Sequence, residues 1–182
     1  MAQAPTLYDF EIALSHVDRS LDAKLNLRVA RHPSETFARV WLRVLAACLF
    51  HEERLVSGKG LSDPDQPDLE VRDLTGDLTL WIRVGKAEPR TLQKVVDQNG
   101  RARVAVLFES PQRMEAFLEE ARDQKLSRLA RAELRAVDPE LLSALAAKED
   151  RRCKASVTIV GDHFYVERAG ESVDGPLTHG AL

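Results

Sequence analysis

Glu35, Arg39 and Arg43 follow one another at four-residue spacing. On a helix this spacing places one carboxylate and two guanidinium groups on a shared polar face, where they can form ion pairs. A carboxylate in the first turn is also favoured by the helix dipole. One interpretation is a well-capped core helix with an ion-paired surface. The other is that Glu35 is an acidic site residue, which its helix holds beside an adjacent sheet.

The helix that carries these side chains is predicted from Ser34 to about Arg54. Pro33 favours an extended conformation for the residue before it and is tolerated at a helix entrance. Ser34 is expected to cap the helix by accepting a backbone hydrogen bond. Apolar residues then recur at three- and four-residue spacing and form one stripe: Phe37, Val40, Trp41, Val44, Leu45 and Cys48.

Two alternating segments precede this helix. Residues 6–16 predict a half-buried strand, and residues 21–29 predict a second strand after a polar turn. We therefore expect an antiparallel hairpin that delivers the chain to Pro33. The inward side chains of its first strand are expected to be Tyr8, Phe10, Ile12 and Leu14.

The middle of the chain predicts a loop and a second hairpin. Residues 57–67 are dense in turn formers, and Gly58-Lys59-Gly60 lacks the preceding strand and the spacing of a phosphate-binding loop. Residues 68–73 and 77–84 predict two short strands around Thr75-Gly76. One face of the second strand is expected to carry Asp77, Thr79, Trp81 and Arg83.

The apolar run from Arg103 to Phe108 is typical of a strand buried on both faces. A predicted helix connects it to the preceding strand, which favours a parallel pair with a right-handed crossover. The other predicted elements are helices over Pro89–Gln98, from Ser110-Pro111 and over Asp138–Ala147, a strand over Arg131–Val137, a hairpin of Lys154–Val160 and His163–Arg168, and a short edge strand after Gly170.

Composition describes an ordinary globular protein, with 182 residues, 44% hydrophobic and 30% charged. The net charge of -3 argues against a surface that coats nucleic acid generally, although a local basic groove remains compatible with it. Cys48 and Cys153 have no CxxC partner, so neither a zinc cage nor a disulfide framework is expected. The sequence shows neither a signal peptide nor an apolar run that spans a bilayer, and we expect a cytoplasmic protein.

Several short motifs resemble those of the bacterial YaeQ proteins: ARHPSET with Arg39 and Arg43 behind it, Glu53-Arg54-Leu55, Gly60-Leu61, Pro67-Asp68, and Leu80-Trp81-Ile82 up to Gly85. The resemblance covers nearly the whole chain. It implies an α/β protein similar to the PD-(D/E)XK nucleases, in one domain over residues 1–182. We therefore expect a restriction-endonuclease-like core, with a mixed central sheet flanked by helices and with added N-terminal and C-terminal hairpins. The first helix should pack on a sheet that contains residues 77–84 and 103–108.

In nucleases of that kind, carboxylates on neighbouring strands and on the first helix hold Mg²⁺, and a lysine helps to activate water. The resemblance assigns Glu35 as the helix acid and Asp68 as the first strand acid. It adds Asp77 as a further acid and Lys94 as a lysine that has moved to the following helix. The expected cleft also contains Arg31, Ser34, Arg39, Thr79 and Arg83.

One position departs from the family pattern. Related proteins commonly read WIExG where this chain reads Trp81-Ile82-Arg83-Val84-Gly85, so Arg83 replaces the strand acid. A guanidinium removes an oxygen ligand and repels a metal ion. We expect Arg83 to pair with Glu35 or Asp77 and the protein to bind without catalysis. The alternative is a Mg²⁺-dependent nuclease that uses Glu35, Asp68 or Asp77, and Lys94.

A basic cluster occupies the second half of the chain. Such a cluster is usually a solvated face, and the alternative is a patch that contacts nucleic-acid phosphates. A protein partner is the other expectation for a binding protein. The cluster consists of Lys125, Arg128, Arg131 and Arg135, with Arg151, Arg152 and Lys154 beyond it.

Overall fold

The computed structural model describes residues 4–58 and 65–182, which form two compact units. Unit 1 contains the described residues up to Phe50 together with Asp138–Leu177. Unit 2 contains the described residues between His51 and Val137 together with Thr178–Leu182. Within the described residues, no helix is long and apolar enough to cross a membrane. The single domain that the sequence suggests stays a prediction.

The sheet of unit 1 begins with the expected hairpin, in which β1 (Thr6–His16) and β2 (Leu21–Arg31) pair antiparallel. The alternating residues Tyr8, Phe10, Ile12 and Leu14 are buried, as predicted. β1 also pairs with the distant β8 (Arg152–Val160), and this pair is parallel. β8, β9 (His163–Arg168) and β10 (Glu171–Gly180) follow as antiparallel neighbours, so the order is β2-β1-β8-β9-β10.

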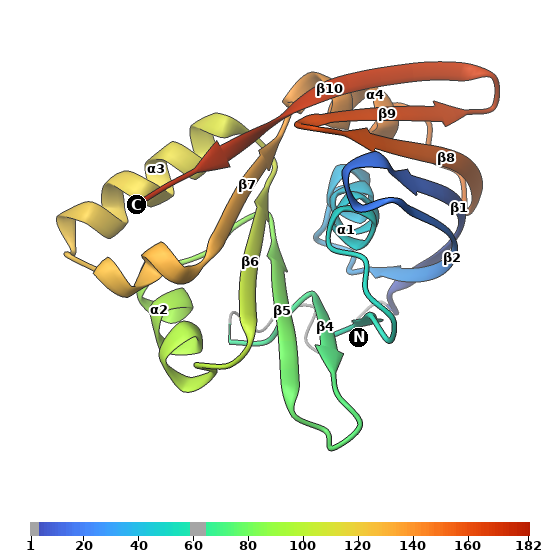
Figure 1. Cartoon of the computed structure of the whole chain (residues 1–182). Helices are drawn as coiled ribbons and strands as arrows, with labels where there is room; N and C mark the ends of the chain where they lie inside the picture. Colours follow the sequence, from blue (N-terminus) through green and yellow to red (C-terminus); the bar gives the residue numbers. More distant parts are fainter. Residues whose placement is uncertain (1–3, 59–64) are drawn as a thin grey trace. The chain divides into compact units, whose positions relative to one another are not determined.

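Helix α1 (Phe37–Leu49) packs on β1 and β2 and against α4 (Pro139–Ala146). The Trp41 ring is fully buried and meets the Phe10 ring edge to face, with a distance of 5.0 Å between ring centroids. Figure 1 shows α1 beside β1 and β2. Trp41 is buried as predicted, and within unit 1 the helix lies on the N-terminal hairpin. Residues 77–84 and 103–108 belong to unit 2, so packing of α1 on those strands stays a prediction.

The entrance to α1 differs from the prediction as well. Residues 32–35 form a turn in which the Glu35 amide donates to the His32 carbonyl, with Pro33 at its second position. The N-cap residue is Thr36, whose side chain makes no capping hydrogen bond. Ser34 does not cap the helix, because the turn takes it out of the capping position and its hydroxyl lies 2.7 Å from His32 Nδ1.

Unit 2 contains the central hairpin of β4 (Leu69–Arg72) and β5 (Leu78–Val84), within one residue of the predicted bounds. β5 pairs parallel with β6 (Arg103–Phe108), which confirms the predicted parallel pair, and β6 pairs parallel with β7 (Glu133–Val137). The two-residue β3 (Val56–Ser57) lies beside β4. The strand order is β7-β6-β5-β4-β3, and the last residues of β10 lie beside β7.

Helices α2 (Pro89–Gln98) and α3 (Pro111–Asp123) cover one face of the unit 2 sheet (Figure 1). Each begins with proline behind a capping side chain, Glu88 for α2 and the predicted Ser110 for α3. Their apolar side chains form one core with the strands, which includes Trp81, Val106, Phe108, Phe117 and Leu134.

The class predicted from the sequence, a mixed α/β protein, is confirmed. The predicted N-terminal and C-terminal hairpins are both present, and both belong to unit 1 together with α1 and α4. The expected short edge strand after Gly170 is the ten-residue β10, which lies between β9 and β7 in the strand order. Two short 3-10 helices complete the described elements: η1 (Val17–Arg19) and η2 (Ser127–Arg131).

Candidate functional site

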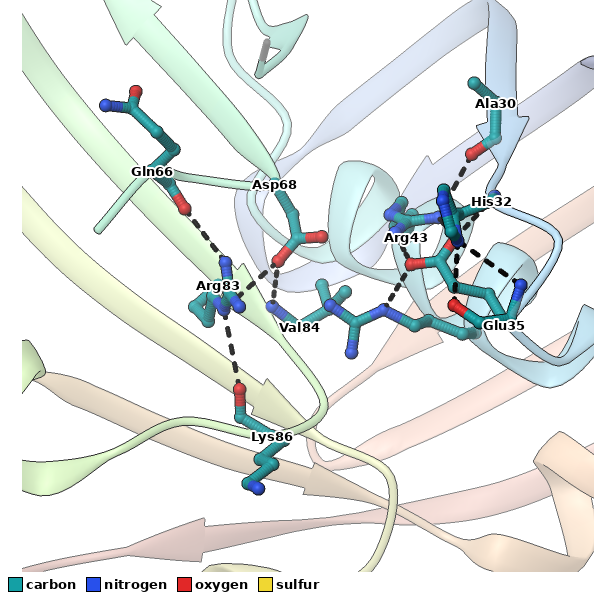
Figure 2. A network of polar contacts seen from close by, with 11 residues as sticks. Ala30, His32, Glu35, Arg43, Gln66, Asp68, Arg83, Val84 and Lys86 are labelled. Atoms are coloured by element: carbon teal, nitrogen blue, oxygen red, sulfur yellow. Dashed lines mark hydrogen bonds and ion pairs between the residues drawn. The ribbon is translucent and has the colours of Figure 1, made fainter. Parts of the chain in front are cut away.

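In unit 1 the Glu35 carboxylate is the centre of a network that the four-residue spacing anticipated (Figure 2). Arg39 Nε donates to Glu35 Oε1 at 2.9 Å, and Arg43 binds both carboxylate oxygens. The His32 amide donates to Glu35 Oε2 at 3.0 Å, and Arg43 Nη1 donates to the Ala30 carbonyl at 3.3 Å. The side chains of Glu35 and Arg43 are only 9% and 4% exposed. This is a buried, fully engaged ion pair.

Two opposing effects determine the protonation state of Glu35. Burial by itself raises the pKa of the carboxyl group. The hydrogen bond and charge of Arg43, the His32 amide and the charge of Arg39 outweigh burial, so the pKa lies below its ordinary value. Glu35 is therefore ionised at neutral pH. An ionised carboxylate already bound by two arginines has little capacity left to ligate a metal ion.

Arg31 belongs to a second network in unit 1. Its Nη1 lies 3.0 Å from Glu149 Oε2, and its guanidinium carbon lies 5.5 Å from the centre of the Tyr8 ring. The Tyr8 hydroxyl donates to Glu149. This hydrogen bond is the largest of the effects that lower the pKa of Glu149, whereas burial and the same hydrogen bond raise the pKa of Tyr8. Arg31, predicted as a cleft residue, thus holds the loop after α4 against β1.

In unit 2 the buried Asp68 lies beside Arg83 (Figure 2). Arg83 Nε is 3.7 Å from Asp68 Oδ2, and the two side chains are 11% and 2% exposed. The Val84 amide donates to the same oxygen at 2.9 Å. Arg83 also donates to the carbonyls of Gln66 and Lys86, at 3.0 and 3.4 Å. The guanidinium is therefore held by one carboxylate and two carbonyl oxygens.

Asp77, a predicted partner of Arg83, lies elsewhere in unit 2. It closes the β4–β5 turn, where its amide donates to the Asp73 carboxylate. Asp68 lies at the opposite end of the hairpin, where its amide donates to the Ile82 carbonyl. Arg83 lies six positions after Asp77 along the extended chain, which corresponds to about 20 Å. Asp77 is thus neither the partner of Arg83 nor a co-ligand for Asp68, and the acid beside Arg83 is Asp68.

Two further predicted side chains of unit 2 lie on the hairpin and on α2. Thr79 donates its hydroxyl to the Val71 carbonyl across the hairpin, at 3.2 Å. Lys94 is exposed on α2, and its Nζ lies 3.7 Å from Asp65 Oδ2. Thr79 and Lys94 thus each make a contact within unit 2 that accounts for where the side chain lies. The catalytic role of Lys94 stays a prediction. Of the Gly58-Lys59-Gly60 segment, Lys59 and Gly60 lie outside the described residues.

Neither network provides a ready metal site. Within residues 4–58 and 65–182, no group of three histidine, cysteine or acidic side chains is arranged to hold a metal ion. The carboxylates closest to the family pattern, Glu35 and Asp68, are each bound by arginine. A Mg²⁺ site needs oxygen ligands near octahedral geometry, usually with several waters. The donor sets of unit 1 and unit 2, each taken alone, do not fit such an ion.

The predicted basic cluster is divided between the two units. In unit 2, Arg128 pairs with Asp97 at 2.9 Å, and Arg131 donates to the Gly100 carbonyl at 2.6 Å. Arg135 donates to the Leu134 carbonyl at 3.1 Å. In unit 1, Lys154 on β8 pairs with Glu11 at 3.0 Å. Several cationic groups thus already have protein partners, and a role in nucleic-acid binding stays a prediction.

Sequence reasoning missed the groups that hold Arg83 in place. The Gln66 and Lys86 carbonyls and the Val84 amide are backbone groups, which every non-proline residue provides, so residue types gave no signal for them. The Tyr8–Glu149 contact was missed because 141 positions separate the two residues. The family resemblance pointed to Asp68 as a strand acid, but the sequence analysis did not pair it with Arg83, for which it expected Glu35 or Asp77.

Known structures resemble the whole chain. The crystal structure of the YaeQ protein from Xanthomonas axonopodis pv. citri matches with a TM-score of 0.86 at 30% sequence identity, covering 99% of each chain. The crystal structure of the YaeQ protein from Pseudomonas syringae matches with a TM-score of 0.81 at 27% identity, covering 96% of this chain and 95% of that one.

Sequence comparison gives the same family. The uncharacterised protein YaeQ of Salmonella typhi is 31% identical over 180 residues, which span 98% of this chain and 97% of that protein. The uncharacterised protein YaeQ of Escherichia coli K12 is 30% identical over 159 residues, or 87% and 86% of the two chains. A family model described as YaeQ protein matches residues 1–176. The chain therefore belongs to the YaeQ family.

Proposed function

We propose that this YaeQ-family protein is a non-catalytic binding protein with a PD-(D/E)XK nuclease-like fold, in which an arginine has replaced the metal ion. The observation that carries the proposal is the Arg83–Asp68 pair. Its two charged atoms lie 3.7 Å apart, and both side chains are nearly buried. Arg83 occupies the position of the strand acid in the WIExG pattern, and Asp68 immediately precedes β4.

The charges in unit 2 argue against metal binding beside Asp68. A unit charge about 4 Å away repels another by roughly 4 kcal/mol at an intermediate dielectric, and Mg²⁺ carries twice that charge. Asp68 Oδ2 also accepts the Val84 amide. An ion would have to displace a guanidinium that two carbonyls hold in place. The guanidinium therefore supplies the positive charge that balances the buried Asp68 carboxylate.

The replacement Arg83→Glu tests this proposal. Two carboxylates would then face each other without a cation, so the melting temperature should fall in EDTA and recover in millimolar Mg²⁺ or Mn²⁺. The matched control Arg83→Gln removes the positive charge without adding a ligand. Its melting temperature should also fall, and adding the metal ion should not restore it. The wild type should show no metal-dependent shift. Stabilisation of the wild type by either ion, or failure of Arg83→Glu to gain from it, would overturn the proposal.

The alternative is a Mg²⁺-dependent nuclease that uses Glu35, Asp68 or Asp77, and Lys94. Incubation of the wild type with mixed DNA and RNA in Mg²⁺ and in Mn²⁺ distinguishes the two functions. We expect no cleavage beyond that of a preparation carrying Asp68→Asn. Cleavage by the wild type that this substitution removes would establish the nuclease instead.

The binding partner is tested by salt dependence. If the unit 2 basic residues Arg128 and Arg131 contact phosphates, affinity for nucleic acid should be micromolar or weaker and should fall steeply between 50 and 200 mM salt. Arg128→Gln should lower the affinity for nucleic acid whatever the base sequence. No binding, or binding that salt does not change, would exclude a phosphate-dominated interaction and leave a protein as the partner.

A further inference from the structure

The two terminal strands of the sheet order differ in how well they are protected against pairing with another chain. In unit 2, β3 has only two residues, and a register shift between Val71 and Arg72 interrupts the pairing of β4. Short edge strands and bulges are common protections of a sheet edge. In unit 1, β2 is eleven residues long and pairs with β1 in unbroken register from Leu21 to Arg31. It contains no proline.

Among the described residues, no strand pairs with the outer edge of β2. β2 is the last strand in the order, and within the described residues its hydrogen-bonded neighbour is β1. The side chains of Leu25 and Val29 point into the core, whereas Asp22, Lys24 and Arg28 are exposed. A strand that pairs on one side only leaves alternate amide and carbonyl groups directed outward. An extended segment added there would gain main-chain hydrogen bonds.

We propose that β2 pairs antiparallel with β2 of a second copy of this chain across a two-fold axis at Leu25. In this register Leu25 faces itself, and Asp22 lies opposite Arg28 of the other copy, twice by symmetry. Opposite charges directly across an antiparallel pair stabilise it. The inward row then places Leu21 opposite Val29 and Ala23 opposite Leu27. In this register, opposite charges therefore face each other on the exposed side and apolar side chains face each other on the inward side.

Neighbouring registers do not match. Because side chains alternate between faces, a shift by one residue would place apolar side chains opposite charged ones. A shift by two places Lys24 opposite itself in one direction and opposite Arg28 in the other. Like charges directly opposite destabilise a strand pair. The Leu25-centred register therefore combines matching faces, opposite charges and pairing from Leu21 to Val29.

The structure also explains where the pairing would end. Ala30 lies just beyond Val29, and its carbonyl already accepts from Arg43 Nη1 within unit 1. Arg28 already lies 2.7 Å from Asp9 on β1, with its side chain 69% exposed. In the dimer this guanidinium would bridge Asp9 and the second copy's Asp22. An interface made by one pair of strands is small, so we expect a reversible dimer with micromolar or weaker affinity.

Register-specific cross-linking tests the proposal. The double substitution Lys24→Cys/Asn26→Cys places cysteines directly opposite each other across the axis, within the distance a disulfide spans. The control Lys24→Cys, which keeps Asp22 and Arg28, places no two cysteines opposite each other in this register. The native thiols are both buried, and burial raises the pKa of Cys48 to about 12, so neither competes. Mild oxidation should convert the first variant, and not the control, to a covalent dimer.

Sedimentation of the uncross-linked protein gives an independent measurement. The apparent mass of the wild type should rise towards twice the monomer mass at high micromolar concentration. Asp22→Arg should weaken association by about tenfold, because two attractive pairs become repulsive, whereas Asp22→Asn should weaken it less. A wild type that stays monomeric at millimolar concentration, or equal cross-linking of both cysteine variants, would overturn the proposal. Neither outcome bears on the role of Arg83.

Discussion

At the scale of single residues, the protein is marked by buried carboxylates that arginines neutralise. Glu35 is bound by Arg39 and Arg43 in unit 1, and Asp68 lies beside Arg83 in unit 2. A buried charge without a partner is expensive, so each acid depends on its cation. Both pairs preserve acids that the family resemblance assigns to a nuclease site, although their surroundings favour charge neutralisation over metal binding.

Replacing Glu35 with glutamine should therefore be strongly destabilising. Arg43 would remain buried without its counter-charge, and loss of one partner of a buried pair typically costs about 3–5 kcal/mol. Urea unfolding at pH 7 measures this loss. Arg39→Gln is the matched control, because the Arg39–Glu35 pair is more exposed and its loss should cost at most about 1 kcal/mol. Equal losses for the two variants would contradict the central role of Arg43.

The Glu35 pair also makes a pH prediction. The pKa of Glu35 is lower in the folded protein than in the unfolded chain, so the unfolded state binds more protons at mildly acidic pH. The stabilisation is complete above the ordinary carboxyl pKa and is lost as the pH falls through the folded value. The stability difference between the wild type and Glu35→Gln should therefore shrink on acidification. A difference that stays constant from pH 7 to pH 3 would show that the ion pair does not cause it.

At the scale of elements, β10 packs closely on the start of α4. A Cβ atom added at Gly175 would lie 2.8 Å from Leu141 Cβ and 2.9 Å from Asp138 Cβ. Asp138 is the N-cap of α4, and its carboxylate accepts from the Leu141 amide. The absence of a side chain at this position thus allows the strand to lie against the capped helix end.

Gly175→Ala should destabilise the protein by about 1–3 kcal/mol, the usual cost of forcing extra atoms into a packed site. Gly100→Ala is the matched control, since no atom lies within 4 Å of a Cβ added there. Thermal unfolding of the two variants beside the wild type measures the difference. Equal melting temperatures for both would mean that β10 moves away from α4 at no cost.

At the scale of the whole molecule, the last residues of the chain belong to unit 2, whereas most of β10 belongs to unit 1. A Cβ atom at Gly180 would lie 2.8 Å from Met114 Sδ and 3.2 Å from Leu134 Cβ, and Leu182 packs against the unit 2 core. The C-terminal segment from Thr178 to Leu182 therefore completes the packing of α3 and β7.

Truncation after Leu177 should reduce the amide hydrogen-exchange protection of β6, β7 and α3 more than that of β1 and β8. Truncation after Gly180 keeps the strand and removes only its last contacts, so it should have a smaller effect in the same direction. Mass spectrometry of peptides from each unit measures both. An equal loss of protection in both units would show that they unfold as one, as the single-domain prediction requires.

The sequence by itself determined the features whose causes lie close together in the chain. The spacing of Glu35, Arg39 and Arg43 predicted their ion pairs, although Glu35 lies in the turn before α1 and not on the helix itself. Alternation predicted the hairpins. At the starts of α2 and α3, a proline directly follows the capping residue, Glu88 or Ser110. These signals are reliable because a helix or a hairpin satisfies its own hydrogen bonds and divides its side chains between faces locally.

The tertiary structure alone decided which distant segments meet. The parallel pairing of β1 with β8 placed α1 on the N-terminal hairpin and made unit 1 out of segments that looked like additions. The partner of Arg83 was decided in the same way, because alternation favoured Asp77 on the same strand whereas the β4–β5 register placed Asp68 beside it. Periodicity reports which face a side chain occupies, and only the packed chain determines what lies opposite that face.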